Sequence, residues 1–332
     1  MDSSDKILVT GAAGFIGSWL SASLVNKGYE VVGADNLQGG DKDNISSDIK
    51  FIKIDLTDPV KVDEVFKQER FGMVFHTAAS AREGLSQFSP RLIAQTNYCL
   101  SMNVIEQSIK YGVNKFIYMS SMSVYGNHEP SFKETMERKP VDVYAVSKTA
   151  TEKSLEILAD VHEFRYTIIR PYCVFGPRQF LADKYRNVIA IFMNSIMRGE
   201  PIWIFGDGTQ KRRFSYIEDS VPAYVACADK ADVGIVNIGG SEEITINDLA
   251  DRVCNAMGSP DHPRKHVSER PKEVKYAYCD NSKSIKLLGY KETFGMNRGI
   301  EKMAAWARKK GPQEWTSEKP AIINDKTPEV WT

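Results

Sequence analysis

The sequence predicts an α/β protein built on a doubly wound parallel sheet, with a smaller lobe of mixed helices and strands. Three observations support this class. Short apolar segments alternate with amphipathic segments over the first half of the chain. The first of these segments runs into a glycine-rich turn. After Arg170 the alternation gives way to shorter, mixed elements, which indicates a lobe on the edge of the sheet. Parallel strands need right-handed crossovers, so we expect helices on both faces of the sheet.

The first predicted strand and helix are joined by three glycines. Residues 7–10 are apolar or β-branched and lead into Gly11-x-x-Gly14-x-x-Gly17, after which apolar residues recur at helical spacing. Such a turn lets backbone N–H groups approach a pyrophosphate, and the helix N-terminus adds unpaired donors. Glycines at this spacing also occur in ordinary turns, so the surrounding strand–turn–helix–strand pattern carries the prediction of a dinucleotide site.

The second predicted strand, residues 30–34, ends at Asp35, about 20 residues beyond the glycine turn. A carboxylate at this place accepts hydrogen bonds from the adenosine ribose and repels the additional phosphate of NADP. The predicted cofactor is therefore NAD. An aspartate with only a turn role is the weaker alternative.

Further strands are predicted at residues 51–54, 73–76 and 115–119, with helices at 59–70 and 90–111 between them. The loop after residues 73–76 begins with small residues, Thr77 to Ser80, which would let a cofactor lie close above the strand end. Ligands of doubly wound sheets bind beyond the carboxyl ends of the strands. The residues at these ends are Gly11, Asp35, Asp55, Ala78, Ser121 and Arg170.

A serine, a tyrosine and a lysine form the candidate catalytic group. Ser121 follows a predicted strand, and Tyr144 and Lys148 share one face of the next helix at i, i+4. A tyrosine has an ordinary pKa near 10, so a nearby cation is needed to stabilise its phenolate. Taken alone, a Tyr–Lys pair is more typical of a solvated helix face. The serine at a strand end and the glycine turn upstream make the catalytic interpretation the stronger one.

The second half of the chain predicts the lobe. We expect a helix from Tyr185 to Arg198, strands at 201–205 and 213–217 joined across a Gly-Asp-Gly turn, and a helix at 217–230. Residues 234–238 are predicted to return to the main sheet. Thr245 is a predicted N-cap, and helices are expected near 281–288 and 296–310. From Gly311 the chain has no periodicity, and the sequence leaves open whether it wraps the surface or is mobile.

Composition favours a small-molecule ligand in the cytoplasm. The 43 basic and 43 acidic residues cancel, so no basic field points to nucleic acid or an anionic membrane. The polar N-terminus and the absence of a long apolar segment predict no signal peptide or membrane anchor and a cytoplasmic protein. The five cysteines are widely spaced without a C-x-x-C pair, so we expect neither disulfides nor a metal site.

The motifs together resemble those of the extended short-chain dehydrogenase/reductases, and within them the NAD-dependent nucleotide-sugar epimerases of the UDP-glucose 4-epimerase type. The resemblance runs from Lys6 to about Trp306. It rests on GAAGFIG at Gly11, the DL pair at Asp55, HTAA at His76, SSMSVYG at Ser120, YAVSK at Tyr144 and RPYCVFGPRQ at Arg170.

The resemblance implies a role for many residues. Ser121, Tyr144 and Lys148 would be catalytic. The implied cofactor contacts are Gly11, Gly14, Phe15, Ile16, Gly17, Asp35, Asn36, Asp55, Leu56, Ala78, Ala79, Asn97, Tyr144 and Lys148. The implied substrate contacts are Ser121, Ser123, Tyr144, Asn187 and Val188, with Arg212 and Arg270 on the diphosphate and Glu273 on the ribose. Without the resemblance, Lys211 to Arg213 could equally be a solvated turn.

The resemblance also implies a domain division. A Rossmann-type NAD-binding domain would comprise residues 1–172 and about 214–240, and a nucleotide-sugar lobe residues 173–213 and 241–310, followed by the tail 311–332. Related enzymes commonly dimerise through the long helices near 90–111 and 145–163, so a homodimer is expected.

The segment after Ser121 separates the possible reactions. Related dehydratases and decarboxylases place an acid directly after the catalytic hydroxyl, whereas Met122 and Ser123 stand here. This favours epimerisation at C4 of a UDP-hexose through a transient 4-keto sugar. Two alternatives stay open: an epimerase for UDP-glucuronate or a UDP-N-acetylhexosamine, and a 4-keto-sugar reductase. A non-enzymatic NAD sensor is the less favoured interpretation. Cys173 replaces the family's usual asparagine, which leaves the identity of the sugar open.

Overall fold

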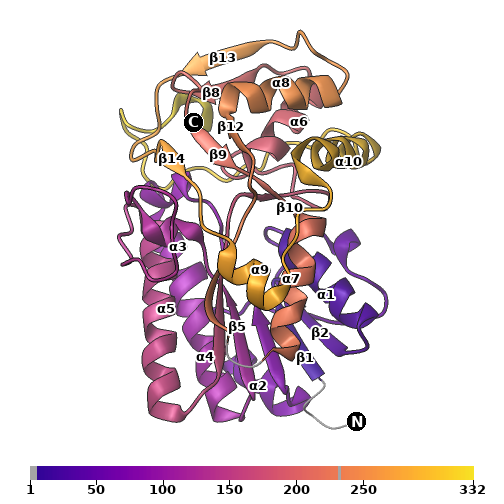
Figure 1. Cartoon of the computed structure of the whole chain (residues 1–332), viewed down its shortest axis with the longest axis vertical. Helices are drawn as coiled ribbons and strands as arrows, with labels where there is room; N and C mark the ends of the chain where they lie inside the picture. The colour runs from indigo at the N-terminus through magenta and orange to yellow at the C-terminus, as the bar shows by residue number, and fades with distance from the viewer. Residues whose placement is uncertain (1–5, 231–232) are drawn as a thin grey trace.

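Seven parallel strands form the centre of the protein. The computed structural model describes residues 6–230 and 233–332, and its main sheet has the strand order β11-β6-β5-β4-β1-β2-β3 (Figure 1). Their bounds are β1 Lys6–Thr10, β2 Glu30–Asp35, β3 Lys50–Lys53, β4 Met73–His76, β5 Lys115–Met119, β6 Tyr166–Pro171 and β11 Gly234–Ile238. The predicted α/β class and the return of residues 234–238 to the sheet are confirmed. Residues 1–5 of the expected first domain lie outside the described part.

Successive side chains of each strand enter two apolar layers. Ile7 and Val9 of β1 join the cluster that contains Leu20, while Leu8 joins the cluster that contains Phe66. The first layer lies under α1 (Phe15–Asn26) and α7 (Ile217–Asp229), and the second under α2 (Pro59–Glu69), α4 (Leu100–Lys110) and α5 (Val143–His162). Both faces of the sheet are thus covered by helices, which explains why the central strands β1, β4 and β5 are mostly apolar, whereas the edge strand β3 exposes Lys50 and Lys53.

The helix predicted over residues 90–111 consists of three consecutive segments. These are α3 (Pro90–Ile93), a π-helical segment (Ala94–Cys99) and α4. The π-helical segment was not predicted. It brings Asn97 to the loop that follows β4, where the side chain of Asn97 accepts a hydrogen bond from the Ser80 backbone N–H at 2.7 Å.

The lobe is built from α6 (Val188–Arg198), α8 (Ile246–Ala256) and α10 (Gly295–Lys310) with three small sheets (Figure 1). These sheets pair β8 (Ile202–Phe205) with β13 (Arg264–Val267), β9 (Lys211–Arg213) with β12 (Glu243–Thr245) and β14 (Tyr276–Ala277), and β7 (Val174–Phe175) with β10 (Ser215–Tyr216). The helix α9 (Ser282–Leu288), which was expected in the lobe, packs instead against α7 and β11 of the main sheet. The predicted N-cap at the start of α8 is present as a capping box, with the Asp248 N–H donating to Thr245 Oγ1 at 3.0 Å.

Two local predictions in the lobe were wrong. The helix expected from Tyr185 begins at Val188, because Asn187 has a left-handed backbone conformation (φ 66°) that no helix continues through. The strands on either side of the Gly-Asp-Gly turn do not form a hairpin. Instead, β8 pairs in parallel with β13, and the predicted strand 213–217 is divided among β9, β10 and the start of α7.

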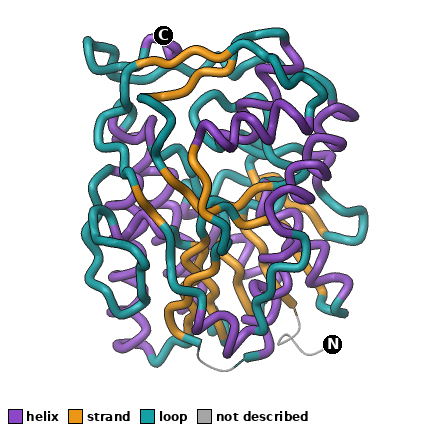
Figure 2. Tube along the Cα trace, turned by 45° about the horizontal axis from the view of Figure 1, so that its top comes forward, coloured by secondary structure: helices purple, strands orange, loops and turns teal. Residues whose placement is uncertain are grey.

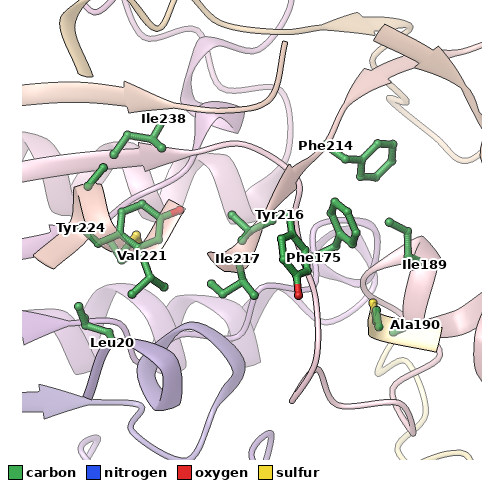
Figure 3. Packing of buried hydrophobic residues seen from close by; sticks show 14 of the residues in the cluster. Leu20, Phe175, Ile189, Ala190, Phe214, Tyr216, Ile217, Val221, Tyr224 and Ile238 are labelled. Atoms are coloured by element: carbon green, nitrogen blue, oxygen red, sulfur yellow. The ribbon is translucent and has the colours of Figure 1, made fainter. Parts of the chain in front are cut away.

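One continuous apolar cluster connects the sheet to the lobe. Figure 3 shows its central part, where Phe175, Tyr216 and Ile217 lie between the side chains of α7 and those of Ile189 and Ala190 in α6. The ring centroids of Phe175 and Tyr216 are 5.5 Å apart. Because this cluster belongs to both parts, it fixes the lobe above the ends of the strands.

The segment after α10 packs along the surface rather than standing free. Figure 2 shows most of it as loop, and it ends beside the lobe in the short 3-10 helix Glu329–Trp331. The Thr316 N–H donates to Ala182 O at 2.9 Å, and the Ile322 N–H donates to Phe88 O at 2.8 Å. Trp331 is only 2% exposed and contacts the rings of Phe88, Tyr185 and Phe205. Across the described ranges, no helix combines the length and apolar character needed to cross a bilayer.

Candidate functional site

A cavity of about 1520 Å³ lies above the carboxyl ends of the sheet strands and extends under the lobe. All the predicted site residues except Asn97 line it. Residues from the ends of β1, β2, β4 and β5 form its floor, whereas α6, β8, β9 and the final segment of the chain form the lobe side. The structure therefore brings the predicted cofactor and substrate residues into one continuous space.

The glycine turn is held tightly against the sheet. Gly11 has φ 71°, and a Cβ on Gly17 would lie 2.1 Å from the Gly11 carbonyl oxygen. A Cβ on Gly11 would lie 2.8 Å from the Ala78 backbone nitrogen. Gly14 is less restricted and faces the cavity. Glycine at positions 11 and 17 is thus required by packing, which brings the first turn of α1 up to the cavity floor.

Asp35 lies at the end of β2, beside this turn. Its carboxylate accepts hydrogen bonds from the backbone N–H groups of Ala13 at 3.0 Å and Leu37 at 2.7 Å, and the residue is 8% exposed. It lines the cavity together with Asn36. A fixed carboxylate at this edge fits the ribose of NAD and disfavours a phosphate there.

The remaining predicted cofactor residues surround the same end of the cavity. Asp55 and Leu56 follow β3, and Ala78 and Ala79 follow β4. Asn97 lies behind this wall, 1% exposed, with its amide bonded to the Ser80 backbone and to the Ser147 hydroxyl. It holds the loop after β4 against α5 and contacts the cavity only indirectly, so its predicted role as a cofactor contact stays a prediction.

The catalytic candidates meet at the middle of the cavity. Ser121 follows β5, and its side chain is a neighbour of the hydroxyl of Tyr144, which stands in the first turn of α5. Burial raises the pKa of Tyr144 above its ordinary value, although the interaction with Ser121 opposes this shift. The Ser123 hydroxyl donates to Ser121 Oγ at 2.9 Å. All three residues line the cavity.

Lys148 lies one helical turn after Tyr144. Its Nζ is 5.9 Å from the centroid of the Tyr144 ring and donates to the Met119 carbonyl oxygen at 2.8 Å. Burial lowers the pKa of Lys148 to about 7, while the nearby Glu152 carboxylate opposes that shift. A phenolate on Tyr144 would favour the protonated amine, so the two groups are expected to titrate as a coupled pair.

A buried ion-pair network fixes α5 against the sheet. Glu152, one turn beyond Lys148, is 0% exposed and accepts two hydrogen bonds from Arg170 at 2.6 and 2.9 Å. It also accepts one from the Ser120 hydroxyl and one from Arg138, both at 2.5 Å. Burial alone would raise the pKa of Glu152, but the hydrogen bonds from Arg170 hold it below its ordinary value. The network connects the ends of β5 and β6 to the helix that carries Tyr144.

The predicted diphosphate residues are brought together, but with an unexpected arrangement. Glu273 forms ion pairs with both arginines, at 2.9 Å to Arg212 and 2.7 Å to Arg270. The residues predicted to bind the substrate thus also form ion pairs with one another. Asn187 and Val188 lie at the start of α6 and line the same side of the cavity. Cys173, at the position of the usual asparagine, lines it too with a left-handed backbone (φ 35°).

Four further cavity residues were missed by the sequence reasoning. Glu83 follows the small residues after β4, and Asp142 is the N-cap of α5. Arg186 donates to the Gly39 carbonyl oxygen at 2.8 Å and pairs with the buried Asp183, which links the lobe to the loop after β2. Trp331 comes from the final segment. Only Asp142 carried a sequence signal, because aspartate before the first helical turn is a typical N-cap.

The sheet, the glycine turn and Asp35 define a dinucleotide-binding enzyme of the Rossmann type. Residues 7–239 match the sequence model of the NAD dependent epimerase/dehydratase family, and the chain belongs to that family. NAD is its cofactor, and Gly11, Gly14, Gly17 and Asp35 are the residues that fit it. In the described residues no group of His, Cys, Asp and Glu side chains is arranged to hold a metal ion.

Relatives and solved structures are similar over nearly the whole chain. UDP-glucose 4-epimerase of Mycolicibacterium smegmatis is 31% identical over 92% of this chain and 99% of its own length. UDP-glucuronate 4-epimerase of Thermodesulfobacterium geofontis is 29% identical over 91% and 95%. The crystal structure of UDP-glucose 4-epimerase from Thermotoga maritima with UDP-glucose has a TM-score of 0.87 at 34% identity, covering 92% of this chain and 99% of that one. The complex of Thermus thermophilus UDP-glucose 4-epimerase with NAD has a TM-score of 0.86 at 28% identity, covering 91% and 98%.

The Glu152 network generates a prediction about stability. Glu152→Ala leaves the Arg170 guanidinium, itself 1% exposed, buried without its partner. We expect the free energy of unfolding to fall by about 3–5 kcal/mol, as for other broken buried pairs. Urea denaturation measures this, with Glu64→Ala on the exposed side of α2 as a control expected within about 0.5 kcal/mol of the wild type. Equal effects of the two substitutions would contradict the assigned role.

The position of Trp331 generates a second prediction. Trp331→Ala removes a wall of the cavity formed with Tyr185 and Phe205, so binding of a nucleotide sugar should weaken about tenfold while the chemical step changes less. Steady-state KM and kcat measure the two effects separately. Ile323→Ala, in the same segment but 56% exposed, is the matched control. A large loss of kcat with unchanged KM would show that Trp331 acts in another way.

Proposed function

We propose that the protein interconverts a UDP-hexose and its C4 epimer, UDP-glucose and UDP-galactose, through a transient 4-keto sugar. The observation that carries this proposal is the grouping of Ser121, Tyr144 and Lys148 in a cavity that is also lined by the glycine turn and Asp35. Met122 and Ser123 follow the catalytic serine, so no acid stands where elimination or decarboxylation in the family would need one.

The roles of the residues follow from their chemistry. Tyr144, as a phenolate, removes the proton of the O4 hydroxyl, and Ser121 holds that hydroxyl in place by a hydrogen bond. Burial disfavours the phenolate of Tyr144. In the proposed mechanism the ammonium group of Lys148, 5.9 Å from the centre of the Tyr144 ring, stabilises that phenolate. Bound NAD supplies the reversible two-electron oxidation of C4. Because the sugar must be reduced again on its other face, the cavity has to let the 4-keto sugar turn while the nucleotide stays held.

The diphosphate is the part of the substrate that stays held while the sugar turns. Arg212 and Arg270 share Glu273 as their partner, and a diphosphate could take over one guanidinium from this carboxylate through bidentate hydrogen bonds. Glu273 would then be available to the ribose hydroxyls. We infer a UDP-sugar as the ligand because both UDP-glucose and UDP-glucuronate epimerases are among the relatives.

Two other enzymatic activities use the same groups. An epimerase for UDP-glucuronate or a UDP-N-acetylhexosamine differs only in the sugar pocket, where Cys173 replaces the usual asparagine. A 4-keto-sugar reductase would consume reduced nicotinamide in each turnover. A protein that binds NAD as a sensor has no need for the Ser121–Tyr144–Lys148 group, which makes this function the least favoured.

The deciding experiment supplies UDP-galactose to the purified protein without added cofactor and follows UDP-glucose. Because NAD is regenerated in each turnover, we expect conversion to proceed to equilibrium with the NAD that the protein retains. Conversion that requires stoichiometric reduced nicotinamide would favour the reductase. Conversion of UDP-glucuronate or a UDP-N-acetylhexosamine in place of the hexose would change the substrate, and binding of NAD without any conversion would favour the sensor.

Tyr144→Phe tests the assigned base. The variant keeps the ring of Tyr144 and should bind NAD as the wild type does, but we expect turnover to fall by at least roughly two orders of magnitude, the contribution of a general base. Extraction and quantification of bound nicotinamide serve as the control for the intact cofactor site. Retained activity would remove Tyr144 from its role.

The homodimer stays a prediction. On α5, Val146, Ile157 and Val161 are 50–65% exposed, and we expect a second copy to cover this apolar face. Light scattering of the purified protein should then give twice the chain mass of 37.3 kDa. A mass of one chain at micromolar concentration would refute the dimer.

A further inference from the structure

Two carboxyl groups outside the catalytic group face the interior of the cavity. Glu83 comes from the loop after β4, and Asp142 precedes the first turn of α5, where it accepts the Ala145 N–H at 2.8 Å. The two carboxyl groups are close enough to interact electrostatically. Asp142 is 8% exposed, whereas Glu83 is open to the cavity. No ion pair is formed by either residue within the described part of the chain, although basic groups surround the cavity.

Glu83 stands between the catalytic group and the predicted diphosphate site. It interacts electrostatically with Tyr144 on one side and with Arg212 and Arg270 on the other. A Cβ on the next residue, Gly84, would lie 3.5 Å from a guanidinium nitrogen of Arg270, which places this loop beside that arginine. A pyranose with its O4 at Tyr144 and its anomeric diphosphate at the arginines must therefore pass the Glu83 carboxyl.

We propose that Glu83, paired with Asp142, gives the sugar end of the cavity a negative charge that admits neutral hexoses and excludes hexuronates. This inference rests on the proposed function, since it assigns the substrate class of that same site. A carboxylate accepts hydrogen bonds from the hydroxyl groups of a neutral sugar. The carboxylate of a hexuronate instead meets a like charge in a partly enclosed space, where repulsion is much stronger than in water.

The arginines do not cancel this charge once a nucleotide sugar is bound. Arg212 and Arg270 are already shared with Glu273, and the substrate's diphosphate brings two more negative charges to them. The positive charges on the other side of Tyr144 are also partly compensated, because Arg186 pairs with Asp183 and Lys148 lies near Glu152. The carboxyl pair of Glu83 and Asp142 forms no ion pair in the described part of the chain.

The pair also titrates near neutrality. Desolvation inside the enclosed cavity, and then the charge of Asp142, raise the pKa of Glu83 to about 7. Burial raises the pKa of Asp142 as well, against its hydrogen bond from the Ala145 N–H. As the pH rises through about 7, Glu83 loses its proton and the pair becomes more negative. The titratable and charged groups that face Glu83 are Asp142, Glu273, Arg212, Arg270, Tyr144 and Cys173.

The test compares the binding of UDP-glucose and UDP-glucuronate to the NAD-loaded protein by calorimetry, so that it does not depend on turnover. We expect the wild type to bind UDP-glucose at least about tenfold more tightly, and Glu83→Gln to reduce that preference by about tenfold through better binding of UDP-glucuronate. Glu64→Gln on the exposed side of α2 makes the same change in charge outside the cavity and should leave the preference unchanged. If Glu83→Gln fails to fold, Asp142→Asn serves instead, because asparagine keeps the N-cap acceptor.

The dependence on pH separates an electrostatic role from a packing role. In the wild type, the preference for UDP-glucose should increase between about pH 6 and pH 8 as Glu83 ionises, and in Glu83→Gln it should be flatter. Equal binding of the two sugars by the wild type, or an unchanged preference in Glu83→Gln, overturns the inference. Equal binding together with epimerisation of UDP-hexoses leaves the proposed function standing, whereas binding of neither sugar overturns both.

Discussion

The position of the catalytic group depends on one buried carboxylate. Tyr144, Lys148 and Glu152 follow one another at intervals of four residues, so they lie on one face of α5. Glu152 is bonded to Arg170 at the end of β6 and to Ser120 at the end of β5. These contacts set both the rotation and the height of the helix relative to the strand ends. Because Ser121 directly follows Ser120, the same network brings the serine and the tyrosine into contact.

The buried network around Glu152 contributes more to the exact position of α5 than to the stability of the fold. Taking an ion pair out of water is costly, and apolar residues of similar size often stabilise a fold as well or better. A network of directional bonds, however, permits only one register between a helix and two strands. The apolar contacts of Leu155 and Ala159 with the sheet are non-directional, whereas each hydrogen bond of Glu152 joins one defined donor to one acceptor. This difference explains why charge is buried at the place where the reaction geometry is set.

Sequence reasoning predicted the sheet and the catalytic group because their signals are local. The glycine turn, the strand ends and the Tyr–Lys spacing are each contained in a few residues, and parallel topology places the strand ends together. The pairing of β8 with β13, which lies far along the chain, has no local signal, so the sequence predicted only two strands joined across the Gly-Asp-Gly turn and no partner for either. In the same way, an acid beside the candidate catalytic group was considered only directly after Ser121, where related dehydratases and decarboxylases have one. The structure supplies Glu83 and Asp142 from two other elements.

The two functional parts of the cavity come from different parts of the fold. The residues proposed to transfer the proton and to bind the cofactor stand on the ends of sheet strands and on α5, which are fixed by buried hydrogen bonds and close glycine packing. The residues proposed to contact the sugar and nucleotide come from connecting loops, from the lobe and from the final segment, where Trp331 packs against Phe205. Substitutions in these loops change the shape and charge of the pocket without disturbing the ion pairs under α5. Members of one family can therefore share the same oxidation chemistry and accept different sugars. We expect the replacement of the usual asparagine by Cys173 to change the sugar that is accepted and not the chemistry.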